Sequence, residues 1–235
     1  MLYAFVFFTL FTAIGFISTF YDKDFPRSLL GDEYVNMTIE NIKKGNAVGV
    51  YASGSNWGTA FSIIFNNLMV GAKLYIWGIF GGIGSLYALL QNSIMLGAFQ
   101  YFFKAQGALA DSARGIWLHG VFEIFSMVIE TMAGLILGAS ILFPKTLSRF
   151  NSFKIGFKDS FKIFLSTVPF TIVAGLIEGF VTRYALKMPV FLNLLIIFGT
   201  LSIIVFYYFM YSRIRYKKLI YDSILPEEGF RSTRK

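Results

Sequence analysis

The sequence predicts an all-α, polytopic membrane protein. Of its 235 residues, 56% are hydrophobic and only 14% are charged, whereas about a quarter of the residues in a soluble domain are charged. Its 28 phenylalanines and 13 tyrosines lie in long runs without alternating polarity, which indicates membrane-spanning helices and not strands. The six expected spans are residues 2–20, 61–80, 86–103, 115–143, 161–181 and 190–212.

Composition excludes several classes of function. The chain has no cysteine, so disulfides and thiolate metal sites are ruled out. Its net charge of +8 comes from basic residues beside the hydrophobic runs, where they orient spans and contact anionic lipid. The sequence has no Walker motif and no dinucleotide fingerprint. We therefore expect the lipid bilayer as a partner, and we expect neither nucleic-acid binding nor a cofactor.

The first hydrophobic run, residues 2–20, carries no charge. It is too long for the apolar part of a signal peptide, no basic region precedes it, and no A-x-A-like cleavage site follows. We interpret it as an uncleaved anchor. Because a charged flank is also missing, we expect the chain to begin inside a longer protein.

Residues 21–59 form the main polar segment, with five acidic and four basic residues. A short helix is predicted there, with Asp32 as its N-cap and Gly45 at its end. Its apolar stripe is Val35, Ile39 and Ile42. Two interpretations fit this stripe: a helix that lies on the membrane surface, or a helix that docks an extracytoplasmic partner.

Charge also predicts the orientation of the spans. The connection 144–162 holds five basic residues against one acidic residue, and the tail 213–235 holds seven against three. The positive-inside rule places both in the cytoplasm. Six spans then put both termini inside and the segment 21–59 outside, in a multi-pass arrangement.

A helix break is predicted between the second and third spans at Gly81, Gly82 and Gly84, because glycine adopts the backbone angles that a break needs. Two alternatives stay open at this point. The break could interrupt one discontinuous helix, or the run 86–103 could be re-entrant. A re-entrant run would move either the basic connection or the segment 21–59 to the other side.

The fourth span carries a titratable seam, formed by His119, Glu123 and Glu130. At about 100° per residue, the three side chains project within about 40° of one another. A carboxylate in the bilayer costs about 2.5–3.5 kcal/mol on insertion scales. The seam must therefore face protein, water or a partner instead of lipid.

Other charged residues in the spans are candidate partners of this seam. We predict an intramembrane polar cluster made of His119, Glu123, Glu130, Glu178, Lys73 and Arg183. One interpretation is a buried cluster that locks helices together, and another is a path for protons or ions. His119 and Glu123 alone are too few ligands for a metal ion, which would need Glu130, Glu178 or another span. We therefore predict no metal site.

Catalytic motifs are poorly supported. Ser85 with His119 faintly resembles an intramembrane serine–histidine pair, but nothing orients the histidine and the sequence around Ser85 is not of the usual order. We predict no enzymatic activity. Gly134 and Gly138 have the small-xxx-small spacing of close helix packing, and such small residues also favour self-association.

Several motifs together resemble one family. They are Asn92–Gly97 (NSIMLG), His119-Gly120 with Glu123, Gly134 and Gly138, Phe143-Pro144, and Glu178–Arg183 (EGFVTR). In this order, over nearly the whole chain, they resemble the stage II sporulation protein M family. The segment GDEYVNMTIENIKKGN at 31–46 is similar to the versions found in Bacteroidota, which do not form spores.

The resemblance implies an integral membrane protein that anchors and recruits peptidoglycan-degrading enzymes without cleaving anything itself. His119, Glu123, Glu178 and Arg183 match the family pattern, and the resemblance gives them no catalytic role. The chain departs from the family in two places: the soluble helical region often found before the first span is absent, and Glu130-Thr131 stand where small residues are usual. We therefore predict a non-enzymatic scaffold of a cell-envelope complex, with other membrane or envelope proteins as partners. The alternative is a transporter or channel component that uses the seam.

Overall fold

The computed structural model describes residues 1–49 and 56–224, and these residues form helices joined by short connections, with no strand among them. The prediction of an all-α protein is confirmed. The long helices are α1 (Leu2–Tyr21), α4 (Asn56–Ile76), α5 (Ile83–Ala105), α6 (Leu109–Leu142), α7 (Arg149–Phe180) and α8 (Val190–Val205). The shorter helices are α2 (Phe25–Leu30), α3 (Asp32–Lys43) and α9 (Ser212–Ile224). A π-helical segment, Phe206–Tyr211, joins α8 to α9.

In the described part of the chain, five helical stretches are long and apolar enough to cross a membrane. They are Leu2–Tyr21, Asn56–Ile79, Leu109–Leu142, Arg149–Tyr184 and Val190–Lys218. Helix α5 covers the expected third span but does not join them, because polar side chains such as Gln91 and Asn92 lower its mean hydropathy. The count of six spans and the side on which each terminus lies stay predictions.

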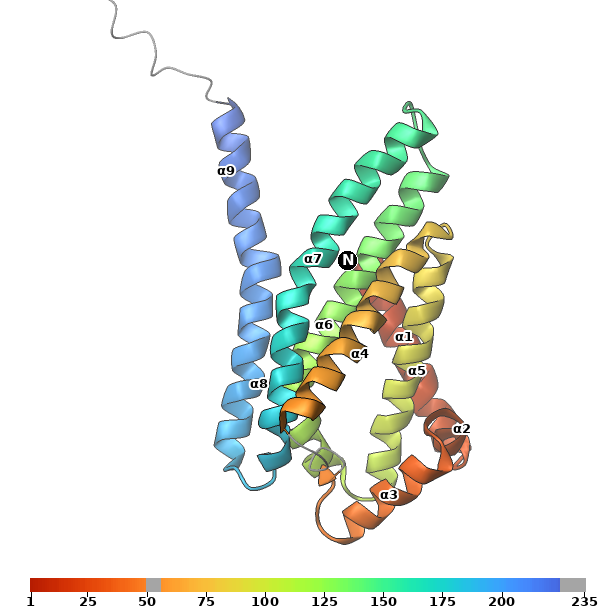
Figure 1. The fold of residues 1–235 in the computed structure, drawn as a ribbon, viewed down its shortest axis with the longest axis vertical. Helices are drawn as coiled ribbons and strands as arrows, with labels where there is room; N and C mark the ends of the chain where they lie inside the picture. Colours follow the sequence, from red (N-terminus) through yellow and green to blue (C-terminus); the bar gives the residue numbers. More distant parts are fainter. Residues whose placement is uncertain (50–55, 225–235) are drawn as a thin grey trace, which may run out of the picture.

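The long helices run alternately up and down the bundle (Figure 1). α1 leads down to α2 and α3, which lie at one end, and α4 then rises from that end. The turn between α4 and α5 and the turn between α6 and α7 lie at the opposite end. The connections from α5 to α6 and from α7 to α8 return to the end that carries α3.

Helix α6 is the central helix of the bundle. Half of its most apolar stretch is buried, compared with 17–28% for the other four stretches. It packs against α7, α4, α5 and α8. This position explains why α6 carries polar side chains without exposing them to lipid.

Glycine lets the α4–α5 hairpin turn sharply. Gly81 and Gly82 have positive φ angles of 65° and 85°, a region that favours glycine. A 3-10 turn, Trp77–Ile79, precedes them. Gly84, which the sequence assigns to the break, already lies within α5, so the break is a tight turn between two antiparallel helices.

The short helices α2 and α3 form a cap on the end of the bundle. Val35 of α3 is buried with Phe102 and Phe103, and Ile39 and Ile42 pack on the same cluster. The apolar stripe of α3 therefore faces protein, and neither a membrane surface nor a docked partner. Asp32 is the first residue of the helix and not its cap, which is Gly31 with a φ of 83°.

The basic connection 144–162 is mostly helix. α7 begins at Arg149, because the side chain of Ser148 accepts a hydrogen bond from the backbone N–H of Asn151 (3.3 Å). Four of the five basic residues of this segment, Arg149, Lys154, Lys158 and Lys162, therefore lie on the first turns of α7, and Lys145 precedes the helix. Residues 50–55 of the polar segment 21–59 and residues 225–235 of the basic tail lie outside the described part of the chain.

Candidate functional site

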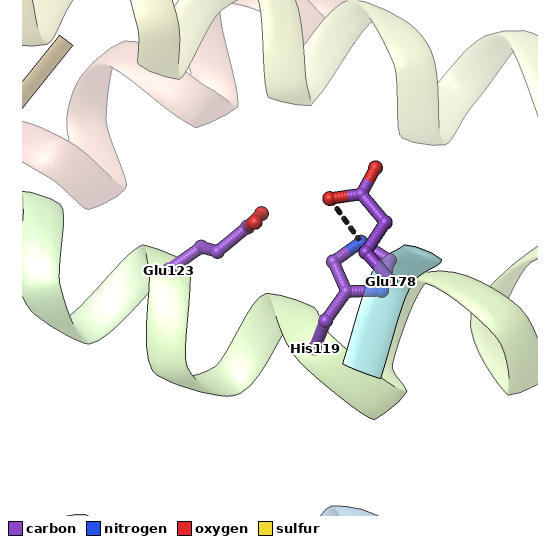
Figure 2. Close-up of side chains that lie close together, drawn as sticks. All are labelled: His119, Glu123 and Glu178. Atoms are coloured by element: carbon purple, nitrogen blue, oxygen red, sulfur yellow. Dashed lines mark ion pairs between the residues drawn. The ribbon is translucent and has the colours of Figure 1, made fainter. Parts of the chain in front are cut away.

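Three titratable side chains from α6 and α7 converge (Figure 2), in a cleft that Leu30 and Tyr34 of the cap also line. His119 Nε2 lies 3.8 Å from Glu178 Oε2. One ligand atom from each of His119, Glu123 and Glu178 lies within 4.8 Å of the other two. We call these three residues the His-Glu cluster.

The side chains of the cluster are largely buried within the bundle. His119 is 3% exposed, the side chain of Glu178 is 13% exposed, and Glu123 is half-buried. Burying a carboxylate is unfavourable unless hydrogen bonds or opposite charge compensate. Thr182 is the hydrogen-bond partner of His119 and Asn67 is that of Glu123, whereas Glu178 has His119 Nε2 at 3.8 Å.

Thr182 orients His119. The Thr182 hydroxyl lies 3.0 Å from His119 Nδ1 and donates to the carbonyl oxygen of Ile177 (3.4 Å). The tautomer of His119 sets which of the two groups donates, and in either case the bond fixes the orientation of the imidazole ring. Nε2 is the nitrogen that faces Glu178.

Glu123 is held from the neighbouring helix α4. Asn67 donates its amide Nδ2–H to Glu123 Oε1 at 2.5 Å.

Glu130 lies about two turns beyond Glu123 on α6 and has its own partner. Thr167 of α7 donates its hydroxyl to Glu130 Oε1 at 2.8 Å, and Glu130 is 4% exposed. Gly71 of α4 makes room for this carboxylate, since an added Cβ at Gly71 would collide with it. The seam of α6 therefore divides into the His-Glu cluster and a separate Glu130–Thr167 pair.

A cleft and a smaller chamber run along the seam. The cleft, about 520 Å³, is lined by residues of α3 to α7, including all three residues of the His-Glu cluster. The chamber, about 210 Å³, is lined by Glu123, Ser126 and Glu130 among others. Both volumes share Asn66, Asn67 and Glu123 as walls. The polar faces of α4 and α6 therefore border both spaces.

Tyr34 of α3 closes the cleft on the side of the cap. Burial raises the pKa of Tyr34 to about 12, and the nearby charge of Glu178 adds to that increase. The phenol is therefore neutral at physiological pH and can donate a hydrogen bond into the cleft.

Known proteins can now be compared with this geometry. The family model described as Stage II sporulation protein M matches residues 4–183. The chain belongs to the stage II sporulation protein M family. No curated protein and no solved structure matches it.

The family match covers the cap, the cleft and all three residues of the His-Glu cluster. Together with the five apolar stretches, it identifies the chain as a membrane protein. The recognition made from sequence motifs is thereby confirmed.

The two basic residues predicted for the polar cluster lie elsewhere in this family member. Lys73 Nζ is 4.3 Å from the centroid of the Trp77 ring. Arg183 donates its Nε–H to the carbonyl oxygen of Gly179 (3.2 Å). Among the described residues, the ion pair of the His-Glu cluster is His119–Glu178, and neither Lys73 nor Arg183 contributes to it.

The structure places Gly134 and Gly138 against the α4–α5 hairpin. An added Cβ at Gly134 would collide with the Ser85 hydroxyl and the Leu74 carbonyl, and one at Gly138 would collide with the backbone of Gly82. Ser85 therefore lies opposite Gly134, fifteen residues or roughly 22 Å along α6 from His119. The structure does not bring the two residues of the weak hydrolase motif together.

Sequence reasoning missed the residues that hold the cluster. The local pattern does not mark Thr182, which contacts His119, nor does it mark Thr167, which holds Glu130 outside the cluster. Asn67 gave a signal, because it is one of two adjacent amides in the second expected span. An amide within an apolar helix needs a partner, but the sequence does not say that the partner is Glu123.

Proposed function

We propose that this chain is a non-enzymatic anchor of a cell-envelope complex in the bacterial inner membrane. Its membership of the stage II sporulation protein M family supports a membrane role. The feature of the fold that carries the proposal is the cap, a rigid platform on one end of the bundle. The basic first turns of α7, at the other end, favour the cytoplasm, so we place the cap outside the cell membrane.

The cap suits a docking role because its apolar side is already occupied. Val35, Thr38 and the stripe around them pack on α5, while the opposite side of α3 exposes polar side chains and Met37, which is 42% exposed. Arg27 of α2 fixes the cap further, by donating to Asp32 and to Asn36, each at 2.9 Å. A partner would therefore meet a preformed polar surface, and binding would require little ordering of the chain.

A photo-crosslinking residue placed on the cap tests this proposal. We expect Met37 replaced by a photoreactive amino acid to form an adduct, in native membranes, with a protein that acts on peptidoglycan. Val35, on the buried side of the same helix, is the matched control and should crosslink only within the chain. Adducts from Met37 that contain lipid alone, or no envelope protein, would contradict the anchor role.

A second candidate is a transport component, and the cleft favours it. A space of about 520 Å³ that contains two carboxylates and a histidine resembles the polar pathways of transporters. The test is flux of protons and small cations in liposomes that contain the purified chain. Flux that Glu123→Gln abolishes would support transport, and equal leakage from protein and empty liposomes would contradict it.

A further inference from the structure

We propose that the His-Glu cluster binds one divalent transition-metal ion, with Zn²⁺ as its best probe. The ligands would be His119 Nε2 and one carboxylate oxygen each from Glu123 and Glu178. This proposal goes beyond the anchor role and does not depend on it, because an ion here would act inside the bundle and not at the cap.

The spacing of the three atoms is close to that of a metal site. Two ligands about 2.1 Å from a tetrahedral Zn²⁺ lie about 3.4 Å from each other. His119 Nε2 and Glu178 Oε2 are 3.8 Å apart, and all three atoms lie within 4.8 Å. A shift of about 1 Å, which rotation of the two flexible glutamates supplies, would complete the geometry.

The separation of His119 and Glu178 also exceeds that of a hydrogen-bonded ion pair. A hydrogen bond from an imidazole nitrogen to a carboxylate is about 2.7–2.9 Å long, so 3.8 Å is too long for one. Two carboxylates share this buried space with a single histidine, and neither Lys73 nor Arg183 reaches it. A divalent cation between the three side chains would compensate both negative charges.

Neighbouring residues orient the ligands as in known metal sites. Metal-binding histidines usually donate their second ring N–H to an oxygen atom, and His119 Nδ1 has Thr182 Oγ1 at 3.0 Å. Glu123 likewise accepts a hydrogen bond from Asn67. One imidazole and two carboxylates form a nitrogen and oxygen ligand set that suits Zn²⁺ and does not require the thiolates that this chain lacks.

The environment of Ser126 is an independent observation that indicates a polar ligand beside the cluster. Ser126 is 3% exposed, and its hydroxyl has no hydrogen-bond partner within the described part of the chain. It lines the chamber that shares Glu123 with the cleft. A metal-bound water in this chamber would satisfy the Ser126 hydroxyl, and three protein ligands leave a coordination position open for water.

The test is equilibrium dialysis of the full chain, purified in detergent and stripped with a chelator, against Zn²⁺. We expect one ion per chain. His119→Gln and Glu178→Gln should weaken binding by more than about 100-fold, and Thr182→Val by about 10- to 100-fold. The matched control is Glu130→Gln, which removes a buried carboxylate of the same helix outside the cluster and should leave binding unchanged.

Two results would overturn the proposal. One is a wild-type chain that keeps no stoichiometric Zn²⁺ after dialysis, and the other is a Glu130→Gln variant that loses as much affinity as Glu178→Gln. X-ray absorption of the wild-type complex decides the matter where a variant does not fold. A first shell of nitrogen and oxygen at about 2.0–2.2 Å with one imidazole supports the site, whereas a shell without imidazole contradicts it.

Discussion

The two halves of α6 differ in how closely they pack against the neighbouring helices. From His119 to Glu130 its buried side borders the cleft and the chamber, and its polar side chains find partners on α4 and α7. From Ala133 to Gly138 the helix lies against the α4–α5 hairpin so closely that a side chain has no room. Large polar residues hold α4 apart from α6 in one half, and glycines bring the two together in the other.

This difference shows how a helix bundle can contain a polar space while the distance between its helices stays fixed. The close contact at the hairpin fixes the distance between α4 and α6, so the cleft is defined by backbone contacts outside it. Glu130 marks the border, because Gly71 makes room for it in the same way that Gly78 makes room for Gly134.

The largest effect should come from filling the close contact. Gly134→Leu would force a side chain into the backbone of α4 and into Ser85, and overpacking of this kind costs about 1–3 kcal/mol or more. We expect little or no monodisperse protein after extraction in detergent, measured by size-exclusion chromatography. Gly199→Leu, in α8, is the control, since an added Cβ there meets nothing within 4 Å. Equal recovery of both variants would show that the two halves do not differ as described.

A smaller effect is expected at the border. Thr167→Val removes the hydroxyl that donates to the buried carboxylate of Glu130, and an unsatisfied buried acceptor costs about 1–3 kcal/mol. The thermal unfolding temperature in detergent should fall. Thr200→Val is the matched control, because the Thr200 hydroxyl bonds only to the backbone of its own helix. If both variants lower the unfolding temperature equally, the hydrogen bond from Thr167 to Glu130 does not stabilise the fold.

The smallest effect should come from Lys73. Its ammonium group lies over Trp77, and such a contact contributes about 0.5–1 kcal/mol at an exposed site. Lys73→Met should therefore change the unfolding temperature only slightly and leave Zn²⁺ binding by the His-Glu cluster unchanged. A loss of Zn²⁺ affinity would place Lys73 in the polar half of the bundle, contrary to the structure.

Sequence periodicity predicts what lies along one helix, and much less of what lies across helices. It predicts that His119, Glu123 and Glu130 share a side, because that follows from 3.6 residues per turn. It also predicts the break at Gly81 and Gly82, since the backbone angles of a turn favour glycine.

The partners of these residues depend on tertiary packing. Glu178 lies near the end of α7 and Thr182 begins the 3-10 turn that follows it, so one short segment supplies both neighbours of His119. That segment meets α6 only in the folded bundle. Lys73 shares α4 with Asn67 but lies six residues away, about 120° from it around the helix. A charge pair between Lys73 and Glu178 therefore fits the composition of the spans but does not fit the packing of α4.

Cysteine labelling tests the contrast between the halves of α6 most directly. The chain has no native cysteine, so only the introduced thiol can react. Ser126→Cys would lie in the polar chamber, and Ala133→Cys, seven residues on, would lie in the close-packed half, where Ala133 is 0% exposed. In membranes, a small water-soluble thiol reagent should label Ser126→Cys and leave Ala133→Cys unlabelled in the same time. Labelling of both, or of Ala133→Cys alone, would contradict a polar space confined to the first half of the helix.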